Sequence, residues 1–307
     1  MSLIEPERDI RHRFIVYQYG KVGSTAVTET LNQVEGFEAH QTHFMGEEPL
    51  REIFDRLLDP NTQPYFFEHA SGQLAENLSV NRYYLRREID GTPLTILGLT
   101  REPFDWFRSA IAQDAIEHLN LLTEMLQRNG EPVGSESENM SRGLRLLFRR
   151  LIEAVAVFGD LDQMCAGARY PVLRAGLEHV DAEDFRVFMY FLNIFLRPHV
   201  WFDKHFTSVL GVSIRQMSAL REDGLFSSFG WGKVFLLKYE ALASGFDAVL
   251  DELGLQTSLP LLRRNVGNSK PFANEIAQAF ASEEGRALKR LCHSSDTRFL
   301  GYPPLQE

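Results

Sequence analysis

The sequence predicts an α/β protein with three layers, in which helices flank a mostly parallel β-sheet. Three segments of the 307-residue chain carry this prediction, because each combines a buried strand with a helix that follows it. These segments begin near Arg13, Leu94 and Val234. Strands that alternate with helices along a chain are typical of parallel βαβ units.

The first segment predicts a strand, a glycine loop and a helix in that order. Residues 13–19 (RFIVYQY) are mostly apolar, β-branched or aromatic, and they end at Gly20. After the loop, apolar residues recur at helical spacing from position 27 to position 34. Residues 36–45 and 64–70 are two further short strand candidates that contain histidines.

The later elements alternate in the same way. Residues 94–100 (LTILGLT) predict a buried strand, and residues 234–239 (VFLLKY) predict another. Between them, apolar spacing predicts an amphipathic helix over 144–155 and a heavily apolar helix over 182–200. The polar, glycine-containing segment between residues 128 and 141 predicts a loop.

Composition limits the classes to which the protein can belong. With 44% hydrophobic and 24% charged residues, the chain has the profile of an ordinary globular protein. No internal repeat or Pro, Gly or Ser-rich linker divides it, so we expect one α/β domain over residues 1–307 with a helical insertion around residues 105–230. The formal net charge of −10 argues against a broad face for nucleic acid or an anionic membrane. No pattern in the sequence indicates an oligomeric state.

The cysteines and the most apolar segments indicate a cytoplasmic protein. Cys165 and Cys292 are too few for a disulfide framework or a four-ligand zinc site. Residues 1–13 carry several acidic residues and no apolar core of a signal peptide. Two arginines and an asparagine interrupt the most apolar stretch, residues 185–202, whereas a bilayer span needs about 20 nearly uncharged residues. We therefore expect no membrane span.

The strongest local signal is YGKVGSTAV at residues 19–27. A glycine-bounded turn between a strand and a helix presents backbone N–H groups at the helix N-terminus, where the helix dipole favours a phosphate. Lys21 would add a positive charge. An ordinary βα turn is the alternative, and the segment departs from the GxxxxGK[ST] pattern because its lysine precedes the second glycine. The predicted phosphate-binding residues are Gly20, Lys21, Val22, Gly23, Ser24 and Thr25.

A second signal surrounds Arg101 in the sequence TREPFDWFRS. Arg101 stands at the carboxyl end of a buried strand, where open α/β sheets bind ligands, and its guanidinium can hold a phosphate with two hydrogen bonds. Ser109 lies eight residues further on, in a helix that starts near Pro103. A salt bridge from Arg101 to Glu102 or Asp105 is the alternative. Together with the glycine loop, this motif predicts a nucleotide with phosphates at both ends.

At these motifs the sequence resembles the sulfotransferases that use 3′-phosphoadenylyl sulfate (PAPS). Residues 21–25 are similar to the 5′-phosphosulfate loop of that family, and residues 101–109 are similar to its 3′-phosphate motif. KVFLLKYEAL at 233–242 resembles the family's late strand. WFDKHF at 201–206, residues 265–270 and the closing SSDTRFLGY resemble bacterial sulfotransferase-like proteins assigned to capsular polysaccharide synthesis. The motifs follow the family order over nearly the whole chain.

The resemblance implies a P-loop-like fold and transfer of a sulfuryl group from PAPS to a hydroxyl of a carbohydrate or glycoconjugate, with PAP as the product. Lys21 would stabilise the charge that builds on the leaving oxygen in a loose transition state. We expect no metal, because a neutral sulfur trioxide fragment carries less charge than metaphosphate. Arg264 and Lys270 lie in a late basic loop that would contact the 3′-phosphate, and a solvated surface run is the alternative.

The acceptor hydroxyl must lose a proton, and histidine is suited to this task because its pKa is near neutral. His43 is the first candidate for the base, because it is similar to the Thr-His-Leu stretch that carries the base in cytosolic sulfotransferases. His40 is the second candidate, and Glu68 or His69 is the third. A partly buried structural histidine is the alternative for each of the three histidines, and for His69 it is the favoured interpretation.

Two other functions remain as alternatives. One is a P-loop kinase that uses ATP and Mg²⁺, and the other is a non-catalytic nucleotide-binding protein of the same fold. The kinase is less favoured because Lys21 is out of the usual register and no acidic strand end accompanies the loop.

Overall fold

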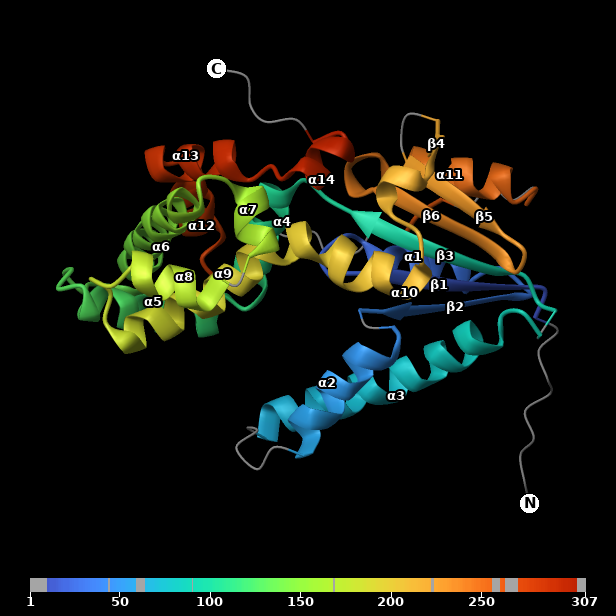
Figure 1. Ribbon diagram of the computed structural model, residues 1–307, viewed down its shortest axis with the longest axis horizontal. Helices are drawn as coiled ribbons and strands as arrows, with labels where there is room; N and C mark the ends of the chain where they lie inside the picture. Colours follow the sequence, from blue (N-terminus) through green and yellow to red (C-terminus); the bar gives the residue numbers. More distant parts are fainter. Residues whose placement is uncertain are drawn as a thin grey trace. The chain divides into compact units, whose positions relative to one another are not determined.

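The chain forms two compact units in the computed structural model (Figure 1). Unit 1 comprises Met1–Thr100 and Phe202–Arg264, and unit 2 comprises Arg101–Trp201 and Asn265–Glu307. The single domain expected from the sequence stays a prediction. The residues that the structure describes are 10–43, 45–58, 64–89, 91–167, 169–221, 224–255, 260–262 and 270–302.

Unit 1 contains a six-stranded sheet with the strand order β2-β1-β3-β6-β5-β4. The first four strands in this order are parallel to one another, and the pairings of β6 with β5 and of β5 with β4 are antiparallel. The predicted α/β class and mostly parallel sheet are therefore confirmed. The strands are β1 (His12–Gln18), β2 (Phe37–Thr42), β3 (Leu94–Thr100), β4 (Ser218–Leu220), β5 (Gly224–Phe229) and β6 (Gly232–Lys238).

The connections of β1 place helices on both faces of this sheet. The chain runs from β1 through α1 (Ser24–Leu31) to β2, and from β2 through α2 (Glu47–Leu58) and α3 (Pro64–Arg86) to β3. The first connection leads from β1 to its neighbour on one side, and the second leads back past β1 to its neighbour on the other side. Because these connections run in opposite directions along the sheet, right-handed crossovers put α1 and α3 on opposite faces. This arrangement is consistent with three layers, and Figure 1 shows α2 and α3 beside β2.

The chain re-enters unit 1 at Phe202, and the remaining elements of this unit lie after that residue. A π-helix over Phe202–Thr207 is followed by α10 (Ser208–Leu210), and Phe206 packs against Gly98 of β3. After β6, a short 3₁₀ turn over Tyr239–Ala241 leads into α11 (Leu242–Glu252), which packs against β6.

The strand expected over residues 64–70 is wrong, because this segment is the first part of α3. Its short aromatic run suits a strand when it is taken alone. The residues that follow form a helical stripe instead, since Asn77, Val80, Asn81 and Tyr84 are all buried at helical spacing. The long helix therefore decides the conformation of its first turns.

Unit 2 is helical and is built around a cluster of phenylalanines. Phe107 of α4 lies with its ring centroid 5.5 Å from Phe195 and 5.7 Å from Phe280. Phe148 lies 4.9 Å from Phe280. The helices are α4 (Pro103–Gln113), α5 (Ala115–Arg128), α6 (Glu136–Phe158), α7 (Leu161–Ala166), α8 (Arg169–Gly176), α9 (Ala182–Trp201), α12 (Ala273–Phe280), α13 (Glu283–Leu291) and α14 (Ser295–Phe299).

The loop expected between residues 128 and 141 is confirmed only in its first half, since α6 begins at Glu136. The Ser135 hydroxyl accepts a hydrogen bond from the Glu138 amide, and the Glu138 side chain accepts one from the Ser135 amide. This capping box starts the helix within a polar sequence. Among the described residues, no helix combines the length and the apolar composition that a bilayer span needs.

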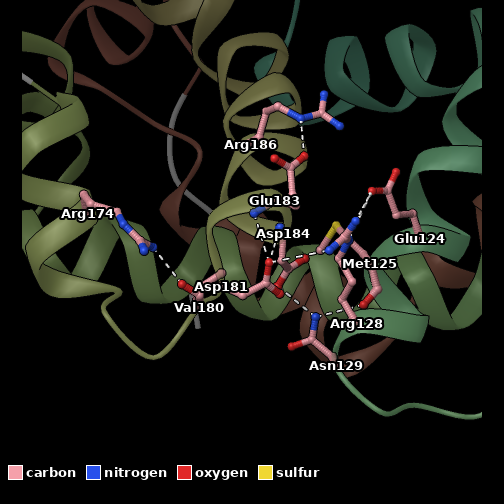
Figure 2. A network of polar contacts seen from close by, with 10 residues as sticks. All are labelled: Glu124, Met125, Arg128, Asn129, Arg174, Val180, Asp181, Glu183, Asp184 and Arg186. Atoms are coloured by element: carbon pink, nitrogen blue, oxygen red, sulfur yellow. Dashed lines mark hydrogen bonds and ion pairs between the residues drawn. The ribbon is translucent and has the colours of Figure 1, made fainter.

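A polar network connects the end of α5 with the start of α9 (Figure 2). Asp181 accepts hydrogen bonds from the amides of Glu183 (2.9 Å) and Asp184 (3.1 Å), as an N-cap does. The Asn129 side chain donates to the Asp184 carboxylate at 2.8 Å, and Arg128 lies 3.8 Å from Asp181. These contacts fix where α9 begins.

Candidate functional site

The glycine loop lies at a point where the strand order of the sheet reverses. It follows β1, whose neighbours are β2 on one side and β3 on the other. In open α/β sheets, the carboxyl ends of strands at such a point form the usual ligand site. Gln18, the last residue of β1, pairs with Leu99 of β3, and the Tyr19 hydroxyl lies 3.3 Å from the Thr100 hydroxyl. The predicted order of strand, loop and helix is confirmed.

The loop has an unusual backbone conformation. Gly20, Lys21 and Gly23 all have positive φ angles, of 93°, 58° and 83°. Glycine takes such angles freely, whereas a residue with a side chain is strained by about 1–3 kcal/mol. Lys21 is one of three non-glycine residues with positive φ among the described residues. Successive amides in a turn of this kind form a concave nest that suits an anion.

Gly23 is required both by its backbone and by its neighbours. A Cβ atom at this position would lie 3.1 Å from the Leu242 side chain and 3.2 Å from the Tyr239 ring. Gly23 is also the N-cap of α1 and provides no side-chain cap, and the first hydrogen bond of the helix runs from the Val27 amide to the Gly23 carbonyl at 3.3 Å. The preceding amides of α1 therefore suit an anion at the helix N-terminus.

The side chains of the loop differ in exposure. Val22 is fully buried and anchors the loop in the core. Lys21 is half-buried, Ser24 is buried and Thr25 is exposed. Lys21 and Thr25 are thus accessible to a ligand, whereas Ser24 is only 8% exposed.

The structure brings His43 to the glycine loop. His43 directly follows β2, and the alternation of side chains along the strand puts it on the same side as Phe37. The Phe37 ring contacts Phe14 of β1 with 5.2 Å between ring centroids. Gln18 shares that face with Phe14. The His43 Nδ1 atom lies 2.9 Å from the Gln18 carbonyl oxygen and 3.0 Å from the Gln18 side-chain nitrogen. Its Cε1 atom lies 3.9 Å from the position that a Cβ on Gly20 would take.

Gln18 is a site residue that none of the sequence motifs reveals. Its side chain is completely buried, and its Oε1 atom accepts a hydrogen bond from the Gly20 amide. The carboxamide therefore lies between the loop and His43. The available signal is a polar residue that follows the apolar and aromatic residues 14–17 at the end of the strand, because a buried glutamine needs hydrogen-bond partners.

His40 lies on the opposite face of β2, away from Gln18. Its ring is 5.4 Å from Tyr83 of α3, and its Nε2 atom is 3.3 Å from Glu38. Glu38 also accepts hydrogen bonds from Arg13 at 2.9 Å and from the Tyr83 hydroxyl at 3.0 Å. Burial alone would raise the pKa of Glu38, but the hydrogen bonds from Arg13, His40 and Tyr83 outweigh it and hold this pKa below its ordinary value. The structure therefore places the two candidate histidines in different surroundings.

Arg101 follows β3 directly and is the first residue of unit 2. The next residue, Glu102, is the N-cap of α4 and accepts a hydrogen bond from the Asp105 amide at 2.7 Å. Burial raises the pKa of the Glu102 carboxyl, which lies 3.9 Å from the His293 ring. The Asp105 carboxylate pairs with Arg108 at 2.9 Å. Glu102 and Asp105, the two acids that could instead pair with Arg101, thus both have roles at the start of α4.

Unit 2 places Lys270 at the helix face that carries Ser109. The Lys270 ammonium donates to the Gln113 side chain at 3.3 Å. Gln113 is four residues after Ser109 on α4, so the two side chains share one face of the helix. Arg264 lies outside the described residues, as do the side chains of Glu68 and His69.

The ends of the four parallel strands carry Gln18, Thr42, Thr100 and Lys238. Among the residues that the structure describes, no group of three or more His, Cys, Asp or Glu side chains is arranged to hold a metal ion. No family model, curated protein or solved structure matches this chain.

Proposed function

We propose that this chain is a sulfotransferase of P-loop-like fold that transfers a sulfuryl group from PAPS to a hydroxyl of a carbohydrate or glycoconjugate. The observation that carries the proposal is the position of His43 beside Gly20 of the glycine loop. A transferase needs a base near the group that it transfers, and the loop suits the phosphate end of the donor. The carbohydrate acceptor comes from the family resemblance.

The proposed nucleotide contacts fall into two sets. The amides from Gly20 to Thr25 and the Lys21 ammonium bind the 5′-phosphosulfate, because the positive φ angles and the N-terminus of α1 favour an anion there. The 3′-phosphate is bound by Arg101, Ser109 and Lys270. Arg101 can form two parallel hydrogen bonds to it through its guanidinium. Arg264 is assigned to the second set on the resemblance alone.

The reaction needs no group beyond these residues. The acceptor oxygen forms a bond to sulfur while the bond between sulfur and the bridging oxygen breaks, and that electron pair stays on the phosphate of PAP. The acceptor proton passes to Nε2 of His43. Lys21 stabilises the charge that develops on the bridging oxygen, as a preorganised cation does in many transfer reactions. The products are a sulfate ester and PAP.

The kinase alternative fits the strand ends less well. P-loop NTPases hold Mg²⁺ with a Ser or Thr of the loop and an acidic residue at a strand end. The parallel strands here end in Gln18, Thr42, Thr100 and Lys238, none of which is acidic. A non-catalytic nucleotide-binding protein would bind the same ligand, but it would have no use for a histidine against the loop.

A nucleotide panel in a thermal-shift assay tests the proposal. PAP should raise the melting temperature of the protein in the presence of EDTA, and ATP with Mg²⁺ should raise it much less. The Lys233→Ala variant is a control, because Lys233 pairs with Glu252 at the amino end of β6. This variant should respond to PAP like the wild type. Stabilisation by ATP and Mg²⁺ but not by PAP would contradict the proposal in favour of the kinase. Stabilisation by neither would contradict nucleotide binding itself.

A further inference from the structure

The contacts of Gln18 determine which nitrogen of His43 carries the proton. The Gly20 amide can only donate, so the atom of the Gln18 carboxamide that faces it must be the oxygen. The amide nitrogen of the same side chain is therefore the atom that lies 3.0 Å from His43 Nδ1. As this nitrogen is a donor, it stabilises an Nδ1 without a proton, and the proton of the neutral ring is then on Nε2.

A second contact favours the opposite tautomer. The main-chain oxygen of Gln18 lies 2.9 Å from the same Nδ1 atom and can only accept. It stabilises an Nδ1 that carries the proton, which leaves the lone pair on Nε2. Nδ1 cannot accept from the Gln18 side-chain nitrogen and donate to the Gln18 main-chain oxygen at the same time. Each of these two contacts therefore stabilises a different tautomer of His43.

The orientation of the Gln18 side chain decides this competition, and Gly20 fixes that orientation. Gln18 is completely buried, so its carboxamide has no solvent partner to replace Gly20. Gly20 is also the first residue of the loop with a positive φ angle, and its amide belongs to the nest that suits an anion.

We propose that Gln18 couples occupation of the glycine loop to the tautomer of His43. Without a ligand, Gly20 holds the carboxamide so that its nitrogen faces Nδ1, and His43 carries its proton on Nε2. An anion that takes the Gly20 amide releases the carboxamide, and Nδ1–H then donates to the Gln18 main-chain oxygen. The ring stays neutral, because it loses the Nε2 proton to water and gains one from water at Nδ1.

The consequence is that His43 becomes a base only after the nucleotide is bound. Only the tautomer with a lone pair on Nε2 can take the acceptor proton at that atom. Gln18 is thus a positioning residue that acts through His43. This step rests on the proposed function, since it takes the anion on the loop to be the phosphosulfate or PAP.

Nitrogen NMR of the full-length protein with ¹⁵N-labelled histidine tests the inference, because protonated and unprotonated ring nitrogens have well separated shifts. Spectra are recorded near pH 8, above the ordinary histidine pKa of about 6.5. The His43→Gln variant assigns the His43 signals among the nine histidines of the chain. Gln18→Met removes both polar atoms of the carboxamide, and Gln18→Glu keeps an acceptor for Gly20 but removes the donor. Gln41→Met is the matched control on β2.

We expect the proton on Nε2 in the ligand-free wild type and in Gln41→Met, and on Nδ1 in both Gln18 variants. Saturating PAP should move the wild-type proton to Nδ1 and leave the Gln18 variants unchanged. A ligand-free wild type with its proton already on Nδ1 would overturn the inference, as would an Nε2 proton in either folded Gln18 variant. Calorimetry with PAP separates the two proposals: absence of binding contradicts the proposed function, while the ligand-free spectra still decide the role of Gln18.

Discussion

Lys21 has a positive φ angle, which is strained for a residue with a side chain, and it carries a positive charge on the glycine loop. In the proposed reaction its ammonium meets charge that grows during transfer, so it contributes more to the transition state than to ground-state binding. Lys21→Ala should therefore lower turnover by about 10²–10³-fold and weaken PAP binding less. Steady-state kinetics and calorimetry measure the two effects, with Lys233→Ala as the control. An equal loss in both would contradict this role.

Arg101 should distinguish nucleotides by their 3′-phosphate. A charge-assisted contact of two hydrogen bonds contributes roughly 1.5–3 kcal/mol, so Arg101→Ala should lose about tenfold to a hundredfold in PAP affinity. Adenosine 5′-phosphosulfate lacks the 3′-phosphate, so its affinity should change little. Arg108→Ala is the matched control, because this exposed arginine on α4 pairs only with Asp105 among the described ion pairs. Equal weakening of both nucleotides in Arg101→Ala would show that the arginine is assigned to the wrong phosphate.

His43 should act on the rate and not on nucleotide binding. His43→Ala should lower turnover by about a hundredfold or more while PAP still binds, because a general base contributes to the proton transfer. The pH–rate profile should also lose its acidic limb, which reports protonation of this ring. His40→Ala should leave both properties nearly unchanged, since its ring lies in the Glu38 cluster on the other face of β2. The reverse pattern in these two variants would move the base to His40.

At the scale of elements, the junction of β1 and α1 depends on Gly23. Gly23→Ala adds a Cβ to a residue with φ of 83° and brings it within 3.2 Å of Tyr239 and Leu242. Gly211, with φ of 69° and no atom within 4 Å of a Cβ, is a matched control. Gly211→Ala should lower the free energy of unfolding by about 1–2 kcal/mol, and Gly23→Ala should lower it more and impair PAP binding. Urea unfolding measures both, and equal losses would mean that the Tyr239 contact has no cost.

The sequence predicts those elements in which local pattern and tertiary context agree. Residues 94–100 are mostly apolar, and every one of them is buried in β3. Residues 64–70 have a local pattern of a strand, but the long helix in which they lie decides their conformation. The positions of the glycine loop and of Arg101 can be predicted, because each directly follows a strand that the sequence pattern shows. The role of Gln18 does not, because it arises only when β1 and β2 pair and bring His43 to it.

At the scale of the whole molecule, two buried histidines make stability depend on pH. Burial lowers the pKa of His12 to about 4, and burial together with the nearby His293 lowers that of His199 to about 3. Above the ordinary pKa of about 6.5, both rings are neutral in the folded and the unfolded chain. As pH falls below that value, only the unfolded chain takes up these protons. The free energy of unfolding should therefore fall between about pH 6.5 and pH 4.

The contribution of His12 to this dependence is about 3 kcal/mol across that window. Its Nε2 atom lies 2.8 Å from the Thr95 hydroxyl, and His12→Gln can keep a hydrogen bond there without titrating. Urea unfolding of the wild type and His12→Gln at several pH values should give a shallower pH dependence for the variant. His179→Gln, at a largely exposed histidine, should follow the wild type. Parallel curves for wild type and His12→Gln would contradict a buried neutral His12.

A crystal structure of the protein with bound PAP tests the central proposal most directly, because it places the ligand and the base in one measurement. We predict that the 5′-phosphate lies on the amides of residues 20–25, and that His43 faces the open position where the sulfate of PAPS would stand. A 5′-phosphate bound away from this loop, or a His43 ring turned away from the open position with another side chain in its place, would contradict the proposed site.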